Sequence, residues 1–354
     1  MKLAIVGAGL VGRLLAWRLN EFSQQQSLDI KITLIEEKDL NFFGTGLIAA
    51  AMVAPFTEAV NSEAITQVLG MRSYQLWGKW LPKLEGQTGK VIAFNKKGTL
   101  LVSHPQDDSD WQRFVIKVKH LVPEDKLQFV ENEALQKLEP ELANRFSKGL
   151  FFAGEGVVNN LALYPALNAY FTQSQDIQVI ENTKITALTN NAYIAKINQQ
   201  FDHVFDCRGN GAKAELKQFR SVRGEVARVY APEVNISRAI RLIHPRFPLY
   251  IAPRDNHEYI IGATQIESDI DTPVTIRSGL ELLSALHSLH EGFGEAQIID
   301  FLVGLRPTLI DNLPRVETNE KLTRINGLYR HGYLFAPALI SDVLDVFQQE
   351  VLVA

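Results

Sequence analysis

The sequence predicts a protein of the α/β class, α+β overall, with a parallel sheet at its amino terminus and a second domain built mainly on an antiparallel β-sheet. Residues 3–6 are apolar and lead through a glycine-rich turn into an apolar helical pattern. Residues 30–34 alternate between apolar and polar side chains, as in a strand. Several β-like runs follow one another between residues 222 and 263. The first two observations indicate a Rossmann-like βαβ unit, and the third indicates the second sheet.

The glycine-rich turn has the spacing of a phosphate-binding turn. Gly7, Gly9 and Gly12 form the pattern GxGxxG directly after the first strand. The first glycine allows the tight turn, the second lets a pyrophosphate approach the backbone, and the third lets the helix approach the strand. The helix then directs its free N–H groups toward the phosphates. Glu36 stands at the end of the next strand, where its carboxylate can accept the ribose hydroxyls of a dinucleotide.

The other elements are expected in an order that interleaves two domains. Helical patterns occur at 62–84, 107–142, 278–289 and 337–352, and a hairpin is expected over 91–103 with its turn at 96–98. Strand patterns occur at 149–158, 177–197, 203–207, 224–231, 248–254 and 257–264, with a last short strand near 334. A second glycine turn follows the strand at 203–207.

The bulk composition favours small metabolites as partners. The 354 residues are 46% hydrophobic, which is enough for a sizeable interior in two domains. The net charge of −4 gives no bulk attraction for nucleic acid or for an anionic membrane, and no apolar segment of ~20 residues predicts a membrane span. The single cysteine and the spacing of the histidines predict neither a disulfide nor a metal site. We therefore expect a soluble, cytoplasmic protein.

Several stretches occur in the order found in one family of flavoproteins. They are GAGLVG at 7–12, AAAMVAPFTE at 49–58, VRGEV at 222–226, LYIAPR at 249–254, IIGAT at 260–264, VGLRP at 303–307 and LYRHGYLFAPALISD at 328–342. On these motifs the chain resembles, essentially from end to end, the D-amino-acid oxidase superfamily of flavoproteins. It is most similar to the glycine oxidase branch of that superfamily.

The resemblance implies a noncovalently bound FAD, with its adenosine and pyrophosphate on the first βαβ unit and its ring near the last helix. Motifs expected to contact the cofactor occur at both ends of the chain, which also suits a ligand that stays bound. The helix after residue 332 could stabilise negative charge at N1 and O2 of the reduced flavin. The positions that match cofactor contacts are Gly7, Gly9, Leu10, Val11, Gly12, Glu36, Thr45, Ala50, Met52, Ile185, Gly209, Arg330, His331, Gly332, Tyr333 and Leu334.

The resemblance also implies the division into domains. An FAD-binding domain is expected from three separate segments, residues 1–60, 145–220 and 300–354. A substrate domain that caps the flavin is expected from residues 61–144 and 221–299.

On the substrate side, the resemblance assigns Arg306 and Tyr250 to the carboxylate of a small amino acid or amine. A guanidinium holds a carboxylate by two parallel hydrogen bonds, and a phenol adds a donor without adding charge. Hydride then passes from Cα to flavin N5, and no general base is assigned. Glycine, sarcosine and D-amino acids are the expected substrates, with O2 reoxidising the flavin to give H2O2.

Structural alternatives stand beside several of these assignments. Arg306 could form an ion pair with Asp311, and Tyr250 could be an ordinary aromatic residue of a sheet. Glu58 is interpreted as a helix-start charge, and His331 as a flavin neighbour or a solvent-facing residue. Cys207 could attach a flavin covalently, but it ends a buried-looking strand far from the family's attachment site.

Departures from the family pattern leave other functions open. Ala51 replaces a glycine, Leu328 replaces a histidine, and the segment 311–317 lacks a closing glycine. A dehydrogenase that passes electrons to a quinone is one alternative. Another is an FAD-binding protein without turnover, or one that acts on a modified amine of a macromolecule. A homo-oligomer is also possible.

Overall fold

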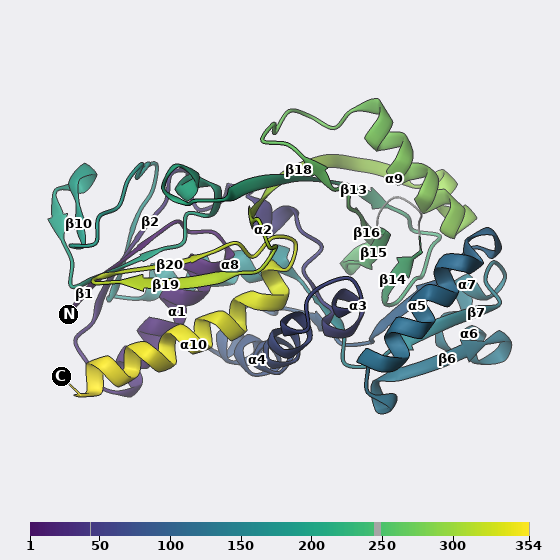
Figure 1. Ribbon diagram of the computed structural model, residues 1–354, viewed down its shortest axis with the longest axis horizontal. Coiled ribbons are helices and arrows are strands. Elements are labelled where there is room, and N and C mark those ends of the chain that lie inside the picture. Colours follow the sequence, from purple (N-terminus) through teal and green to yellow (C-terminus); the bar gives the residue numbers. More distant parts are fainter. Residues whose placement is uncertain (43, 244–248, 354) are drawn as a thin grey trace.

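Two β-sheets organise the molecule. The computed structural model describes residues 1–42, 44–243 and 249–353. A six-stranded sheet lies near both chain ends, and a nine-stranded sheet occupies the other half of the molecule (Figure 1). The long antiparallel pair β13 (Phe219–Tyr230) and β18 (Gln297–Leu309) runs along the top of this view, between the two regions.

The six-stranded sheet contains the predicted Rossmann-like unit. Its order is β19-β20-β12-β1-β2-β9, and all neighbours are parallel except β19 and β20. Apolar side chains fill β1 and β2, because both faces of a parallel sheet are covered. The strands are β1 (Lys2–Val6), β2 (Lys31–Ile35), β9 (Ile177–Ile180), β12 (His203–Asp206), β19 (Arg315–Asn319) and β20 (Leu322–Asn326).

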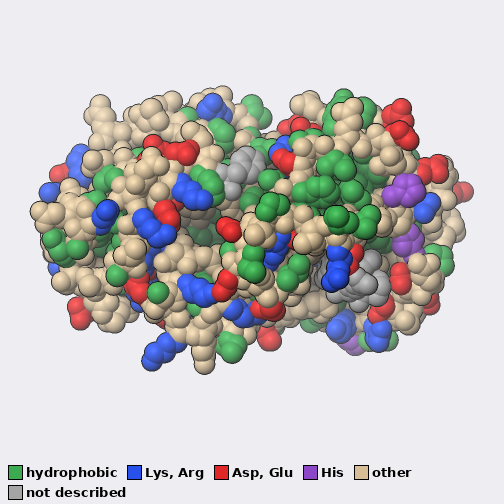
Figure 2. Space-filling view, turned by 90° about the horizontal axis from the view of Figure 1, so that it is seen from above, with side chains coloured by type: hydrophobic (Ala, Val, Ile, Leu, Met, Phe, Trp, Pro, Cys, Tyr) green, Lys and Arg blue, Asp and Glu red, His purple; other side chains and the backbone are tan. Residues whose placement is uncertain are grey.

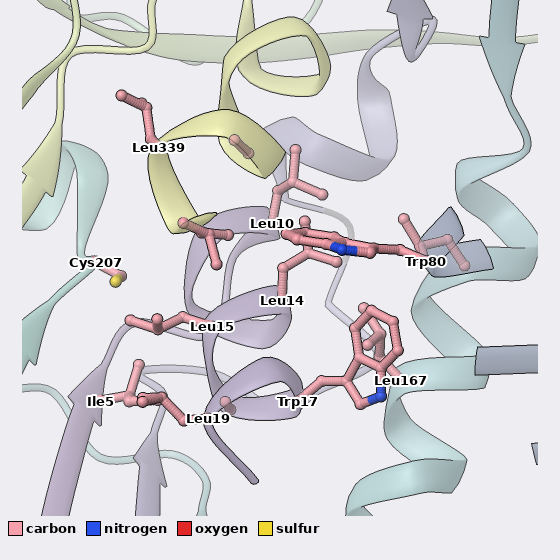
Figure 3. Packing of buried hydrophobic residues seen from close by; sticks show 14 of the residues in the cluster. Ile5, Leu10, Leu14, Leu15, Trp17, Leu19, Trp80, Leu167, Cys207 and Leu339 are labelled. Atoms are coloured by element: carbon pink, nitrogen blue, oxygen red, sulfur yellow. The ribbon is translucent and has the colours of Figure 1, made fainter. Parts of the chain in front are cut away.

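Four helices build the core against this sheet. They are α1 (Leu10–Gln25), α4 (Ile65–Thr88), α8 (Asn160–Gln173) and α10 (Gly332–Val353). Leu14, Leu15 and Leu19 of α1 are fully buried and lie in one cluster with Trp17, Trp80 and Leu339 (Figure 3). The indole of Trp17 packs edge-on against that of Trp80, at a centroid distance of 6.0 Å. This contact packs the middle of α1 against α4.

The nine-stranded sheet is mainly antiparallel, as predicted. Its order is β17-β13-β16-β15-β14-β5-β7-β6, with β18 also pairing with β13, and only the pair β14–β5 is parallel. Its remaining strands are β5 (Thr99–Val102), β6 (Leu127–Glu131), β7 (Lys148–Phe152), β14 (Ala239–Leu242), β15 (Leu249–Pro253), β16 (Glu258–Gly262) and β17 (Ile266–Glu267).

Shorter elements complete the fold. The remaining helices are α2 (Thr45–Ile48), α3 (Pro55–Ala59), α5 (Asp108–Leu121), α6 (Asn132–Leu138), α7 (Pro140–Ala143) and α9 (Ile276–Leu289). The remaining strands are β3 (Met52–Val53), β4 (Phe94–Asn95), β8 (Gly156–Val158), β10 (Tyr193–Ile194) and β11 (Gln199–Gln200). None of the helices in the described ranges is long and apolar enough to cross a membrane.

Three local predictions are wrong. The hairpin over 91–103 does not form, because β4 pairs with β8 and β5 pairs with β14 and β7, in a different sheet. No strand forms near 334, because α10 already begins at Gly332. A strand, β6, interrupts the helical stretch 107–142 by pairing with β7. For β4, β5 and β6 a strand partner distant in sequence overrides the local signal.

The predicted domain boundaries stay a prediction. All six strands of the parallel sheet fall in segments 1–60, 145–220 and 300–354. However, β7 lies within 145–220 and pairs in the nine-stranded sheet, and β18 crosses residue 300.

Exposed apolar side chains gather on one face. Figure 2 shows hydrophobic side chains on the half of this face that carries α9 and β18. Ile276 and Leu280 of α9 are 84% and 61% exposed, and Ile298 and Ile299 of β18 are 50% and 42% exposed. The predicted homo-oligomer stays a prediction.

Candidate functional site

A cavity of about 450 Å³ extends from the carboxyl end of the parallel sheet to one face of the nine-stranded sheet. Its lining includes the turn after β1, the ends of β2 and β12, the start of α10, and side chains from β13, β15 and β18. The carboxyl edge of a parallel sheet is where such folds bind dinucleotides. The cavity therefore lies where the sequence places a cofactor.

The glycine-rich turn has the geometry that its spacing predicts. Gly7 has a φ of +98°, and a Cβ there would lie 2.6 Å from the carbonyl oxygen of Cys207. A Cβ on Gly12 would lie 1.9 Å from the carbonyl oxygen of Gly7, so only glycine lets α1 approach β1 this closely. A Cβ on Gly9 would meet nothing within 4 Å. Gly9 leaves open space in front of the N-terminus of α1, which is a ready anion site.

Glu36 and Ile185 both line the cavity. The Glu36 carboxylate accepts a hydrogen bond from the backbone N–H of Ala8 at 2.6 Å, which ties the end of β2 to the glycine turn. The carbonyl of Ile185 accepts from Nη1 of Arg208 at 3.0 Å. Arg208 is itself held by Asp206 and Glu215. Arg208 was not predicted as a site residue.

The structure brings together seventeen of the eighteen predicted site residues around one cavity. The exception is Gly12, which lies behind the turn and packs α1 against β1. The residues that line the cavity are Gly7, Gly9, Leu10, Val11, Glu36, Thr45, Ala50, Met52, Ile185, Gly209, Tyr250, Arg306, Arg330, His331, Gly332, Tyr333 and Leu334.

Arg306 and Tyr250 approach each other over two glycines of the nine-stranded sheet. A Cβ on Gly224 of β13 would lie 2.1 Å from Nη2 of Arg306. A Cβ on Gly262 of β16 would lie 2.6 Å from the hydroxyl of Tyr250. Arg306 extends from β18 and Tyr250 from β15, and the neighbouring strands β13 and β16 lie between these two. The guanidinium and the phenol therefore lean toward each other across the sheet. The absence of a side chain at both glycines makes room for the guanidinium and the phenol, which both line the cavity.

Arg306 does not pair with Asp311. Its Nη1 donates to the carbonyl of Arg223 at 3.4 Å and its Nη2 donates to the carbonyl of Thr264 at 3.1 Å. Asp311 instead pairs with Arg315 at 3.0 Å. Among the residues that the structure describes, no carboxylate forms an ion pair with Arg306, so its charge stays available to a ligand.

Glu58 is part of the cavity wall, and its interpretation as a helix-start charge is incomplete. Glu58 does lie in the first turn of α3. Its carboxylate, however, forms an ion pair with Arg241 on one oxygen. The other oxygen contacts Nη2 of Arg330 at 3.0 Å and Nε2 of His331 at 2.9 Å. His331 is 4% exposed, so it does not face solvent.

The titration of this cluster follows from burial and charge. Burial alone would raise the pKa of Glu58, but the charges of Arg241 and Arg330 outweigh it and hold that pKa well below its ordinary value. Burial lowers the pKa of His331, although Glu58 partly opposes the shift. At neutral pH we therefore expect an ionised Glu58 beside a neutral His331.

Thermal stability should decrease as pH falls below about 6.5, and His331 should account for part of that decrease. Its pKa is lower in the folded protein than in the unfolded chain, so the unfolded chain binds the proton first and folding stability is lost as pH falls. For one group the slope is at most about 1.4 kcal/mol per pH unit. Melting temperatures of wild type and His331→Asn between pH 7.5 and 5 check this.

The variant should show the shallower decrease. His203, whose pKa burial lowers to about 4, acts over the same range and remains in both proteins, so only their difference reports His331. If the melting temperatures of the two proteins fell equally with pH, the assignment of the decrease to His331 would be contradicted.

Two positions that line the cavity differ from the family pattern. Ala51 has a φ of +56°, which lies in the left-handed region that favours glycine. This backbone conformation accounts for the glycine that the family pattern has at this position. Leu328 is 6% exposed and lines the cavity. Cys207 packs in the core, where burial raises its thiol pKa well above the ordinary value, so it is a poor nucleophile.

Residues far apart in sequence support the cavity wall and were missed. Arg254 donates to the carbonyl of Ala50 at 2.7 Å and to the side chain of Asn160 at 3.0 Å. Asn160 in turn donates to the carbonyls of Gly46, Leu47 and Ala49 at 2.8 to 3.0 Å. Asn160 belongs to no local pattern that would distinguish it from an ordinary polar residue, whereas Arg254 ends the motif LYIAPR but was not assigned to the site. The described residues contain no cluster of His, Cys, Asp and Glu that could hold a metal ion.

Gly9→Ala should weaken FAD binding about tenfold or more while leaving the protein folded. The methyl group would meet no protein atom within 4 Å, and the φ of −72° suits alanine, so the cost falls on a ligand in front of the helix. Flavin fluorescence titration of the apoprotein gives the affinity, and the melting temperature without FAD gives the stability. Unchanged affinity would place the phosphates elsewhere.

Comparisons with known proteins give one consistent family match. Residues 2–342 match the family described as DAO, FAD dependent oxidoreductase. The chain is 34% identical over 343 residues to the "Putative thiamine biosynthesis oxidoreductase ThiO" of Rhizobium etli, covering 97% of this chain and 95% of that protein. It is 24% identical over 376 residues to the glycine oxidase of Geobacillus kaustophilus, covering 97% of this chain and 92% of that protein.

A solved structure shows the same fold. The crystal structure of glycine oxidase from Geobacillus kaustophilus superimposes with a TM-score of 0.81 at 22% sequence identity, covering 98% of this chain and 94% of that one.

Proposed function

The chain belongs to the family of FAD-dependent oxidoreductases, and on that premise we propose that it oxidises the carbon–nitrogen bond of a small amino acid or amine. The observation that carries this proposal is the approach of the Arg306 guanidinium and the Tyr250 hydroxyl over Gly224 and Gly262. A cation and a neutral donor, both facing one small space, suit the carboxylate of an amino acid. The relatives named as glycine oxidase support the same substrate class.

The residues present fit FAD. The open space in front of Gly9, at the N-terminus of α1, suits the pyrophosphate, and Glu36 at the end of β2 suits a ribose. Arg330, Gly332 and Tyr333, at the start of α10, would hold the ring end, where the helix N-terminus and a guanidinium favour negative charge. When bound, FAD supplies the hydride acceptor, and we propose O2 as the final electron acceptor, giving H2O2.

The protein's own part in the reaction is to orient the substrate. Arg306 and Tyr250 fix the carboxylate, which decides which Cα–H bond faces the ring. The substrate reacts with a neutral amine, whose lone pair forms the imine as the hydride leaves. Burial raises the pKa of Tyr250 despite the opposing charges of Arg306 and Arg241, so the phenol stays protonated and donates to the carboxylate. No side chain is needed to remove a proton from Cα.

Anaerobic titration tests this function. We expect the yellow protein to lose its flavin absorbance when glycine, sarcosine or a D-amino acid is added, and to form H2O2 when O2 is admitted. Bleaching without peroxide would indicate a dehydrogenase with a different acceptor. A protein that holds FAD but bleaches with none of these amines would contradict the amine oxidation, and a protein that stays colourless with excess FAD would contradict the cofactor assignment.

A further inference from the structure

Arg241 is a buried cation in the cavity wall that the proposed oxidation of a simple amino acid does not use. Its side chain is 6% exposed, and it extends from β14. It lines the main cavity and also a second cavity of about 580 Å³ that shares Tyr329 and Arg330 with the first. Arg241 therefore lies where the two spaces meet.

The hydrogen-bonding capacity of Arg241 is mostly unfilled. A guanidinium carries five N–H donors. Throughout residues 1–42, 44–243 and 249–353, the only acceptor for them is one carboxylate oxygen of Glu58. Nε of Arg241 is buried without any partner in that part of the chain. Buried donors are nearly always paired in folded proteins, so an arginine with unpaired donors in a cavity wall favours an anionic ligand there.

The register of the sheet places Arg241 beside the proposed carboxylate site. Arg241 pairs directly with Tyr250 across β14 and β15, and directly paired residues direct their side chains to the same face. Tyr250 pairs in turn with Gly262, over which its hydroxyl leans toward Arg306. Tyr250 thus lies between two guanidiniums, Arg306 on one side and Arg241 on the other.

Positively charged side chains outnumber carboxylates at this end of the cavity, which favours binding of a further anion. Three guanidiniums, those of Arg241, Arg306 and Arg330, line it. Glu58 is the only carboxylate among the described residues that line this end. Glu155 also lies near Arg241, but its oxygens accept from the backbone of Phe56 and Thr57 and from the hydroxyl of Thr57, and it does not line the cavity.

We propose that Arg241 binds a second acidic group of the substrate, so that the enzyme prefers dicarboxylic amino acids or amines. The first carboxylate lies on Arg306 and Tyr250, and the second takes the free N–H groups of Arg241, with Glu58 holding the guanidinium in place. This assignment rests on the proposed function and names its substrate class. A simple amino acid such as glycine would fill only half of this site.

Binding of unreactive acids tests the site without turnover. Diglycolate carries two carboxylates and no amine, and methoxyacetate is its counterpart with a single carboxylate. Added to the oxidised, FAD-loaded protein, diglycolate should perturb the flavin spectrum with a dissociation constant at least about 30-fold lower than that of methoxyacetate. Arg241→Met should remove most of this preference.

Two further variants control this result. Arg228→Met removes a guanidinium that pairs with Glu258 and Asp300 and does not line the cavity, so it should leave the preference unchanged. The double variant Arg241→Met/Glu58→Gln removes both charges of the pair together, and it should lose the preference even if the single variant folds poorly. Equal binding of the two acids by wild type, or a preference that survives both Arg241 variants, would overturn the proposal.

Turnover separates this proposal from the proposed function. The ratio of kcat/KM for iminodiacetate, D-aspartate or D-glutamate to that for glycine should exceed one in wild type for at least one of these dicarboxylates. That ratio should fall about 30-fold or more in Arg241→Met. If glycine bleaches the flavin and no dicarboxylate reacts faster than glycine, the second-acid site is overturned and the proposed amine oxidation stands. If diglycolate binding depends on Arg241 but no amine bleaches the flavin, the amine oxidation is overturned and the second-acid site stands.

Discussion

Arg306→Leu should retain bound FAD and lose about 10³-fold or more in kcat/KM for an amino acid. The guanidinium is the one cation at the proposed carboxylate site without an anionic partner among the described residues, and leucine supplies no donor. Without it the carboxylate is neither neutralised nor aligned, and a factor of 10³ corresponds to about 4 kcal/mol of transition-state stabilisation. Stopped-flow reduction under anaerobic conditions measures the loss.

Two variants show whether this loss is specific. Arg315→Leu removes an exposed guanidinium that pairs only with Asp311 among the described residues, and it should reduce the flavin at the wild-type rate. Arg306→Lys keeps the charge but not the two-pronged geometry, so its rate should fall between those of wild type and Arg306→Leu. Wild-type kinetics in Arg306→Leu would remove Arg306 from the substrate site.

Gly12→Ala should destabilise the protein by about 3 kcal/mol and weaken FAD binding about 100-fold or more. The new Cβ would lie 1.9 Å from the carbonyl oxygen of Gly7, so β1 and α1 must move apart. That movement shifts the glycine turn that lines the cavity. Helix propensity alone predicts the opposite sign, since alanine is favoured over glycine in a helix by about 1 kcal/mol.

Gly86→Ala is the matched control for this substitution. Gly86 lies in α4, is exposed, and a Cβ there would meet nothing within 4 Å. This variant should be as stable as wild type or more stable, and it should bind FAD unchanged. Chemical denaturation and flavin titration of both variants give the comparison. A Gly12→Ala protein as stable as Gly86→Ala would show that the close approach of α1 to β1 is not required.

The structure confirms the predicted local geometry of the glycine-rich turn. GxGxxG after an apolar strand specifies a tight turn, an open position and a close helix approach, all within six residues. Residues so close in sequence have little freedom to be arranged otherwise. The carboxyl-end position of Glu36 likewise follows from one alternating strand.

The cluster around Glu58 could not be predicted in the same way. Glu58 meets Arg241 across 183 residues of sequence and His331 across 273 residues. No local spacing relates them, and each has an ordinary interpretation by itself. The predicted hairpin at 91–103 fails for the same reason, because β4 pairs with β8 and β5 pairs with β14, in two different sheets.

The sequence by itself determined the βαβ unit, the FAD family and seventeen of the residues that line the cavity, but not Arg208 or Arg241. Only the tertiary structure decided how these residues face one another: Arg306 and Tyr250 leaning together over Gly224 and Gly262, and Arg241 beside Tyr250. The reason is physical. A turn or a strand is encoded by neighbours in the chain, whereas the distance between two side chains on different strands depends on the order and register of the strands between them.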